Sequence, residues 1–118
     1  MKKYNIIPKN LEECFIELKK ILPEGALEKF KNTKEDEAVV NAHFGLGIWI
    51  RNEWIRNRPG EPQRPLKKYF SDIGIYHPDD MSSIILRSFH RYLNSKDIKL
   101  EQQVNYYQEY WEKVKEER

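Results

Sequence analysis

The sequence predicts an all-α protein, a single compact domain of about five helices over residues 1–118. Three observations support this. Apolar residues recur at helical spacing in several segments, and Asn, Asp or Pro stands near the start of most of them. Strand signals are poor, because no Asn-Gly or Asp-Gly turn occurs and strict alternation of apolar and polar residues never persists. A chain of 118 residues also has the length of one domain.

The first helix is expected to begin after Asn10, a favoured N-cap residue, with Glu13 placed three positions later as in a capping box. Pro23 ends this helix, and a short helical turn follows through residues 26–30. The apolar face of the first helix is formed by Leu11, Phe15, Leu18 and Leu22.

The second long helix is expected over about residues 34–55, opening at Thr33 with Asp36 and Glu37 in its first turn. Apolar residues fall on nearly every side of it, so it is predicted to be the central, buried helix of the fold. Its segment HFGLGIWIRNEW (residues 43–54) contains two glycines.

A glycine inside a helix costs roughly 0.8–1 kcal/mol relative to alanine, so the glycines predict a compensating gain. We expect Gly45 or Gly47 to let another helix cross closely, over Phe89 or Trp111. A phosphate-binding loop would place glycine at a strand-to-helix turn, and no strand precedes this segment.

A basic, proline-rich loop is expected over residues 56–65, followed by a short helix over residues 65–73 and a longer one from Pro78 to Asn94. The last helix is expected to start near Asp97. Its remaining positions are almost wholly polar, apart from Tyr106 and Tyr110, and its apolar stripe is formed by Leu100, Val104, Tyr107, Trp111 and Val114.

Basic side chains gather in the middle of the chain, where residues 51–70 carry Arg51, Arg56, Arg58, Arg64, Lys67 and Lys68. Two interpretations stay open for the arginines. They form an internal salt-bridge network that holds the loop, in which Arg51 reaches Asp72, Asp79 or Asp80. Alternatively they form a site for an anion or an acidic surface beside exposed aromatic rings. The candidate binding residues are Trp49, Arg51, Asn52, Trp54, Arg56, Arg58, Arg64, His77 and Asp80.

Catalytic and metal motifs are absent from the sequence. It has no cysteine pair, no HExxH motif and no serine in a nucleophile elbow, so we expect neither an enzyme, a metal site nor a cofactor. His43, His77 and His90 are each expected to be structural, although His77 with Asp79 and Asp80 has the side chains for acid–base chemistry. The single cysteine, Cys14, is expected to be a small buried hydrophobe.

Neither a signal peptide nor a membrane span is predicted, because no apolar run is long enough. The expected location is therefore the cytoplasm.

The segments HFGLGIWIRNEW and HPDDMSSIILRSFHRYLN resemble the motifs of a family of small bacterial proteins of unknown function, with the similarity covering about residues 38–111. The chain departs from the family pattern in its loop IRNRPGEPQRP and in Ser95, where glycine is usual. The resemblance implies no activity.

The function predicted is that of a non-enzymatic binding module, with another protein as partner. By analogy with other small helical proteins, many of which are immunity or antidote proteins, we expect an inhibitor or immunity-type protein that acts on a toxin or defence effector. The alternative is a small-ligand or nucleotide-phosphate binder, in which Arg51, Arg56 and His77 surround a pocket lined by Trp49 and Trp54. A membrane or a nucleic acid is not expected as partner.

Overall fold

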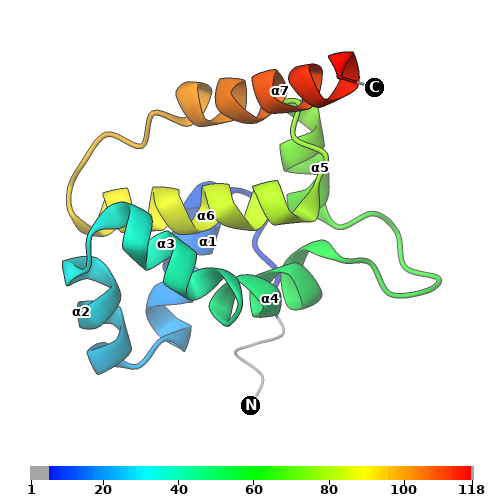
Figure 1. The fold of residues 1–118 in the computed structure, drawn as a ribbon. Helices are drawn as coiled ribbons and strands as arrows, with labels where there is room; N and C mark the ends of the chain where they lie inside the picture. Colours follow the sequence, from blue (N-terminus) through cyan, green and yellow to red (C-terminus); the bar gives the residue numbers. More distant parts are fainter. Residues whose placement is uncertain (1–5, 118) are drawn as a thin grey trace.

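A computed structural model describes residues 6–117, and within that range the chain is all-α, with seven α-helices, one π-helical turn and no strand. The helices form one globule, as predicted (Figure 1). Their bounds are α1 Leu11–Ile21, α2 Glu24–Asn32, α3 Glu35–His43, α4 Leu46–Ile50, α5 Pro65–Asp72, α6 Pro78–Leu93 and α7 Leu100–Glu116, and the π-helical turn covers Arg51–Ile55.

Helix ends follow the local signals in the sequence. The Asn10 side chain accepts a hydrogen bond from the Glu13 backbone N–H at 2.9 Å, which caps α1 as expected. Pro65 and Pro78 occupy the first positions of α5 and α6, where a missing N–H costs nothing. Gly74 follows α5 with a φ of +92°, a left-handed conformation that glycine adopts without strain.

The helix α6 lies at the centre of the molecule, with α3 and α4 on one side, α7 on the other and α1 behind it (Figure 1). Seven of its side chains are fully inaccessible to solvent: Met81, Ser82, Ile84, Ile85, Leu86, Ser88 and Phe89. The core is therefore organised around α6. The prediction that residues 34–55 form the central buried helix is wrong, because α6 occupies that position.

The segment 34–55 is divided rather than continuous. Helix α3 ends at His43, the chain turns at Phe44 and Gly45, and α4 follows. The last turn widens into a π-helix, closed by the Arg56 N–H donating to the Arg51 carbonyl at 2.8 Å.

An apolar stripe of this segment also faces solvent. Val40, Phe44 and Ile48 are spaced four residues apart and are 66%, 78% and 39% exposed. The all-round apolar pattern predicted burial wrongly here, because no element within residues 6–117 covers this side of α3 and α4.

The two glycines of this segment differ. A Cβ on Gly47 would lie 3.3 Å from the Ala42 carbonyl oxygen and 3.7 Å from Leu86 of α6, so bare backbone is needed there. A Cβ on Gly45 would meet nothing within 4 Å. The tight neighbours of Gly47 are thus Arg51 and Ala42 of its own segment, and Leu86 of α6 is at ordinary van der Waals distance. The close crossing expected over Phe89 or Trp111 is not found at either glycine.

The last helix, α7, begins at Leu100, after Lys99 in a left-handed conformation (φ 53°), three residues later than Asp97. Only Gln103 and Val104 of its described residues are buried. The Gln103 amide donates to the Ser88 hydroxyl of α6 at 3.1 Å, which fixes the first turns of α7 over the core.

Among residues 6–117, no helix combines the length and the apolar character that crossing a bilayer requires. Cys14 is completely buried, as predicted, and burial raises the pKa of its thiol above the usual range.

Candidate functional site

A cleft of about 570 Å³ lies between the start of α6 and the second half of α7. Its floor is formed by residues 77–80, at the first turn of α6, and Arg56 stands at its edge. Its aromatic wall, formed by α7, consists of Tyr106, Tyr107, Tyr110 and Trp111. We call this feature the aromatic cleft.

Helical spacing explains the aromatic wall. Tyr107 and Trp111 lie four residues apart, and so do Tyr106 and Tyr110, so the two pairs form adjacent rows on α7. Tyr107 is half-buried, whereas Tyr106 and Tyr110 are 65% and 50% exposed. The row of Tyr107 and Trp111 therefore anchors α7, and the row of Tyr106 and Tyr110 presents aromatic surface to solvent.

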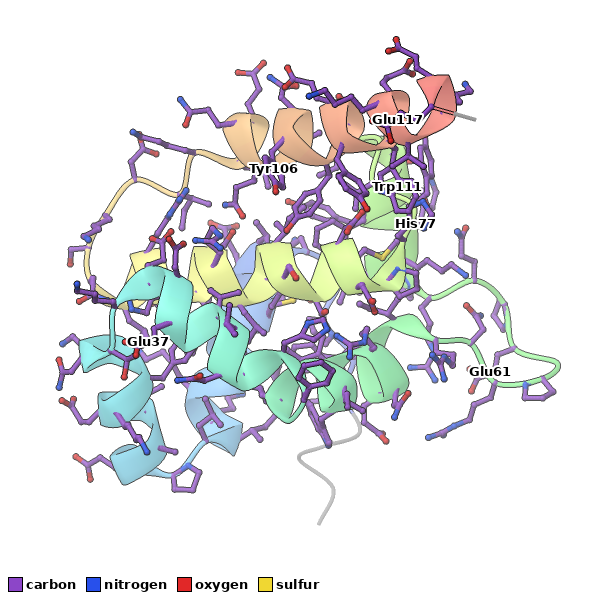
Figure 2. The ribbon with its side chains drawn as sticks, viewed as in Figure 1. Glu37, Glu61, His77, Tyr106, Trp111 and Glu117 are labelled. Atoms are coloured by element: carbon purple, nitrogen blue, oxygen red, sulfur yellow. The ribbon has the colours of Figure 1, made fainter. Side chains whose placement is uncertain are left out.

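Trp111 closes one end of the aromatic cleft through two contacts with the start of α6. Its ring stacks on His77, with centroids 3.8 Å apart and planes inclined by 16°. Its indole N–H donates to Asp80 Oδ2 at 2.8 Å. Figure 2 shows Trp111 reaching from α7 toward His77, so these contacts join two segments that are distant in sequence.

Burial dominates the electrostatics of Asp80 and raises the pKa of its carboxyl group. The indole hydrogen bond from Trp111 and the nearby His77 oppose that rise in pKa, and Asp79 adds to it. Burial likewise raises the pKa of the Tyr107 hydroxyl, so that tyrosine is neutral at physiological pH.

Asp79 links the aromatic cleft to the core. Its Oδ1 lies 3.2 Å from Arg51 Nε, while the carboxylate side chain stays 71% exposed. Arg51 itself is only 8% exposed and also donates to the Ser82 hydroxyl at 2.8 Å. Arg51 therefore braces the π-helical turn against α6, and of the three acids considered for it the structure selects Asp79.

Three of the predicted site residues, Arg56, His77 and Asp80, meet in the aromatic cleft. The tryptophans of HFGLGIWIRNEW do not. Trp54 is fully buried, and half-buried Trp49 packs against it edge-to-face at 5.3 Å. Neither ring lines the aromatic cleft.

The remaining predicted residues lie around the loop. Arg64 is buried and holds the loop by donating to the Glu53 carbonyl at 2.8 Å and pairing with Glu61 at 3.1 Å. Arg58 is an exposed side chain 3.8 Å from Glu53, and Asn52 is exposed. The salt-bridge interpretation therefore holds for Arg51 and Arg64.

The aromatic wall and Asp79 are not among the residues that the sequence predicts for the site. Tyr106 and Tyr110 interrupt an otherwise polar helix surface, and this was the signal that could have found the wall. Trp111 was assigned to the inward apolar stripe; it does face the core side, yet it remains 36% exposed.

The other histidines have structural surroundings. His90 Nε2 lies 2.7 Å from the Thr33 carbonyl oxygen, a hydrogen bond between α6 and the end of α2. His43 contacts Phe44 edge-to-face at 4.7 Å. No group of three His, Cys, Asp or Glu side chains in residues 6–117 is placed to hold a metal ion.

A family model described as a domain of unknown function (DUF6794) matches residues 7–93. The matched region begins well before the FGLG motif and ends before α7, so it differs from the range 38–111 over which the motifs were recognised. No curated protein matches the chain, and no solved structure does either.

Proposed function

The chain belongs to this family, which has no assigned function, and from its surface we propose that it is a non-catalytic module that binds another protein through the aromatic cleft. The observation that carries the proposal is the exposed aromatic wall. Tyr106 and Tyr110 line this cleft and are 65% and 50% exposed, and Trp111, which holds α7 against α6, is still 36% exposed. Tyrosine and tryptophan are the residue types most enriched at interface hot spots.

The position of the wall supports the same proposal. Its rings project from a regular helix that is itself fixed by Trp111 and Gln103, so they lose little conformational freedom when a partner binds. Tyr76, which is exposed beside His77, extends the aromatic surface around the start of α6. Rigid, half-exposed rings of this kind suit protein recognition.

The alternative, an anionic small ligand, has less support. The pocket expected around Trp49 and Trp54 is disfavoured, because Trp54 is fully buried and Trp49 packs against it. Arg56 and His77 do line the aromatic cleft, but Asp79 and Asp80 stand beside them and disfavour an anion.

An inhibitor or immunity-type role, with a toxin or defence effector as partner, is the specific form of this proposal that we favour. This role rests on an analogy with the functions of other small helical proteins. Identification of the captured partner would test it.

Affinity capture with paired variants tests the proposed surface. The tagged protein is used to capture proteins from the cells that encode it, and the recovered proteins are compared with those recovered by Tyr106→Ala/Tyr110→Ala. We expect at least one protein captured by the wild type to be lost with the double variant, because the wall supplies its contact area.

Phe44→Ala is the control, since Phe44 is an exposed aromatic residue in the turn between α3 and α4. Those two helices lie on the other side of α6 from α7 (Figure 1). The Phe44→Ala variant is expected to retain the captured partner. The proposal fails if the double variant, folded by circular dichroism, captures every partner as the wild type does.

A further inference from the structure

The chemistry of the aromatic cleft points to the kind of side chain that it accepts. Its wall is aromatic, and its floor carries two carboxylates, Asp79 and Asp80, from consecutive positions of α6. We propose that the cleft binds an arginine side chain of the partner protein, with the guanidinium lying against the tyrosine rings and paired with the two carboxylates. This inference rests on the proposed protein-binding function and specifies what that site recognises.

Each carboxylate has one oxygen still available. Asp80 Oδ2 accepts the Trp111 indole N–H, and Asp79 Oδ1 pairs with Arg51. Asp80 Oδ1 and Asp79 Oδ2 have no hydrogen-bond or ion-pair partner among residues 6–117. Both side chains line the aromatic cleft, so these oxygens offer a cation two acceptors that the fold itself leaves unused.

Of the two carboxylates, Asp80 has the greater need for a cationic partner. Its carboxylate is half-buried, and its only hydrogen bond within the described chain comes from a neutral indole. A partly desolvated carboxylate without a cation gains more from an incoming guanidinium than an exposed one does. Arginine suits this place better than lysine, because its planar fork reaches two acceptors while its face stacks on aromatic rings.

Charge around the aromatic cleft is consistent with a basic partner. The exposed surface of α7 next to the wall carries Glu109, Glu112 and Glu116 with one lysine, Lys113, so it is acidic on balance. Glu112 also lines the cavity on the other side of His77 and Trp111. This arrangement repels phosphate backbones and attracts a basic segment of a protein.

Arg56 is the feature that makes the inference sharply testable. It lines the aromatic cleft and is exposed, yet it forms none of the salt bridges found between described residues. If the cleft binds a cation, Arg56 opposes binding by like charge. If the cleft binds an anion, Arg56 contributes to binding.

The experiment titrates the full chain, labelled with ¹⁵N, with the peptide acetyl-Gly-Arg-Gly-amide and follows the Trp111 indole N–H signal. That signal is assigned by its loss in Trp111→Phe. The citrulline analogue of the peptide has the same shape without the charge, and inorganic phosphate serves as the anionic probe. We expect the arginine peptide to shift the signal saturably and the citrulline peptide to bind about tenfold more weakly.

Two substitutions should act in opposite directions. Asp80→Asn keeps an acceptor for the Trp111 indole and should weaken arginine-peptide binding by about tenfold, whereas Arg56→Ala should strengthen it by about threefold. Glu24→Gln, the same loss of charge at an exposed position of α2, should leave binding unchanged.

Equal binding of the citrulline and arginine peptides, no saturable shift with the arginine peptide, or weaker binding by Arg56→Ala would each overturn the inference. A shift with phosphate that Arg56→Ala abolishes would instead establish an anion site. These outcomes are separate from failure of the proposed function, in which the Tyr106→Ala/Tyr110→Ala variant retains every captured partner whatever the peptides do.

Discussion

Arg91 and Glu35 form a two-pronged ion pair between α6 and α3, with Arg91 Nε and Nη2 each 2.9 Å from a different oxygen of the Glu35 carboxylate. Arg87 adds a third contact, at 2.7 Å from Glu35 Oε2. The Glu35 side chain is only 21% exposed, so water screens these contacts less than it screens a surface pair. The carboxylate therefore holds the first turn of α3 against the central helix.

Glu35 should make the stability of the protein depend on pH under acidic conditions. The Arg91 hydrogen bond is the largest cause that lowers the pKa of Glu35 from 4.5 to about 2, and Arg87 adds to the shift. A carboxyl group with a lowered folded-state pKa stabilises the fold fully above its unfolded pKa, and this stabilisation is lost as the pH falls from 4.5 toward 2. Glu35→Gln should lower the free energy of unfolding at pH 7 by about 2–3 kcal/mol.

Urea denaturation at several pH values measures this effect, and the difference between wild type and Glu35→Gln should shrink as the pH approaches 2. Asp36→Asn is the control, because Asp36 also contacts Arg87 but its side chain is 90% exposed. It should cost less than about 1 kcal/mol. A pH-independent difference for Glu35→Gln would contradict the assignment.

Replacing Arg51 should lower the free energy of unfolding, because this side chain is buried and joins the π-helical turn to α6. Arg51→Ala removes the hydrogen bond to Ser82 and the pair with Asp79, and it leaves unfilled space beside Gly47. We expect a loss of about 2–3 kcal/mol in the free energy of unfolding. Arg56→Ala, at an exposed position, should stay within about 0.5 kcal/mol of the wild type. Equal melting temperatures for the two variants would show that Arg51 does not brace the fold.

Gly47→Leu should destabilise the protein by about 1–3 kcal/mol through overpacking. A Cβ at this position lies 3.3 Å from a backbone oxygen, which cannot move aside as a flexible side chain can. Gly45→Ala is the control, because its Cβ would meet nothing and its φ is −114°. Thermal unfolding followed by circular dichroism compares them, and a stable Gly47→Leu variant would mean that the segment packs differently.

Cys14 should resist thiol reagents in the folded protein. The reactive species is the thiolate, and burial both raises the thiol pKa and blocks access. Labelling by 5,5′-dithiobis(2-nitrobenzoate) at pH 8 should be negligible in buffer and complete in denaturing urea. Rapid labelling without denaturant would contradict the burial of Cys14 in the core.

Local sequence signals predicted the start of α1, the starts of α5 and α6 and the end of α5, because the causes of these ends are local. They did not predict the break at residues 44–45, and they placed the start of α7 three residues too early. Asn10 and Glu13 cap α1, and the two N-terminal prolines and Gly74 act on the residues next to them. The burial of residues 34–55 was predicted wrongly for the opposite reason. Whether Val40, Phe44 and Ile48 are covered depends on elements elsewhere in the chain, which a periodic pattern does not describe.

The candidate site was only partly predictable, because the sequence shows the chemistry of single residues but not which distant segments meet. Arg56, His77 and Asp80 were selected for their chemistry, and the structure brings these three together. The sequence did not reveal that α7 folds back over the start of α6, so the contact of Trp111 with His77 and Asp80 was not foreseen. That contact is between residues more than thirty positions apart.

The region matched by the family model contains one part of the aromatic cleft and leaves out the other. The charged floor of the cleft, residues 77–80, lies inside the matched region, whereas its aromatic wall lies beyond residue 93. Gln103, Val104, Leu100 and Tyr107 pack α7 on the core, so substitutions at its outward-facing positions leave the core untouched. Under the proposed function, the aromatic side of the binding surface is therefore supplied by α7 and its carboxylates by the matched region. A library randomised at the outer positions of α7 would test whether the proposed binding can be redirected while the scaffold is kept.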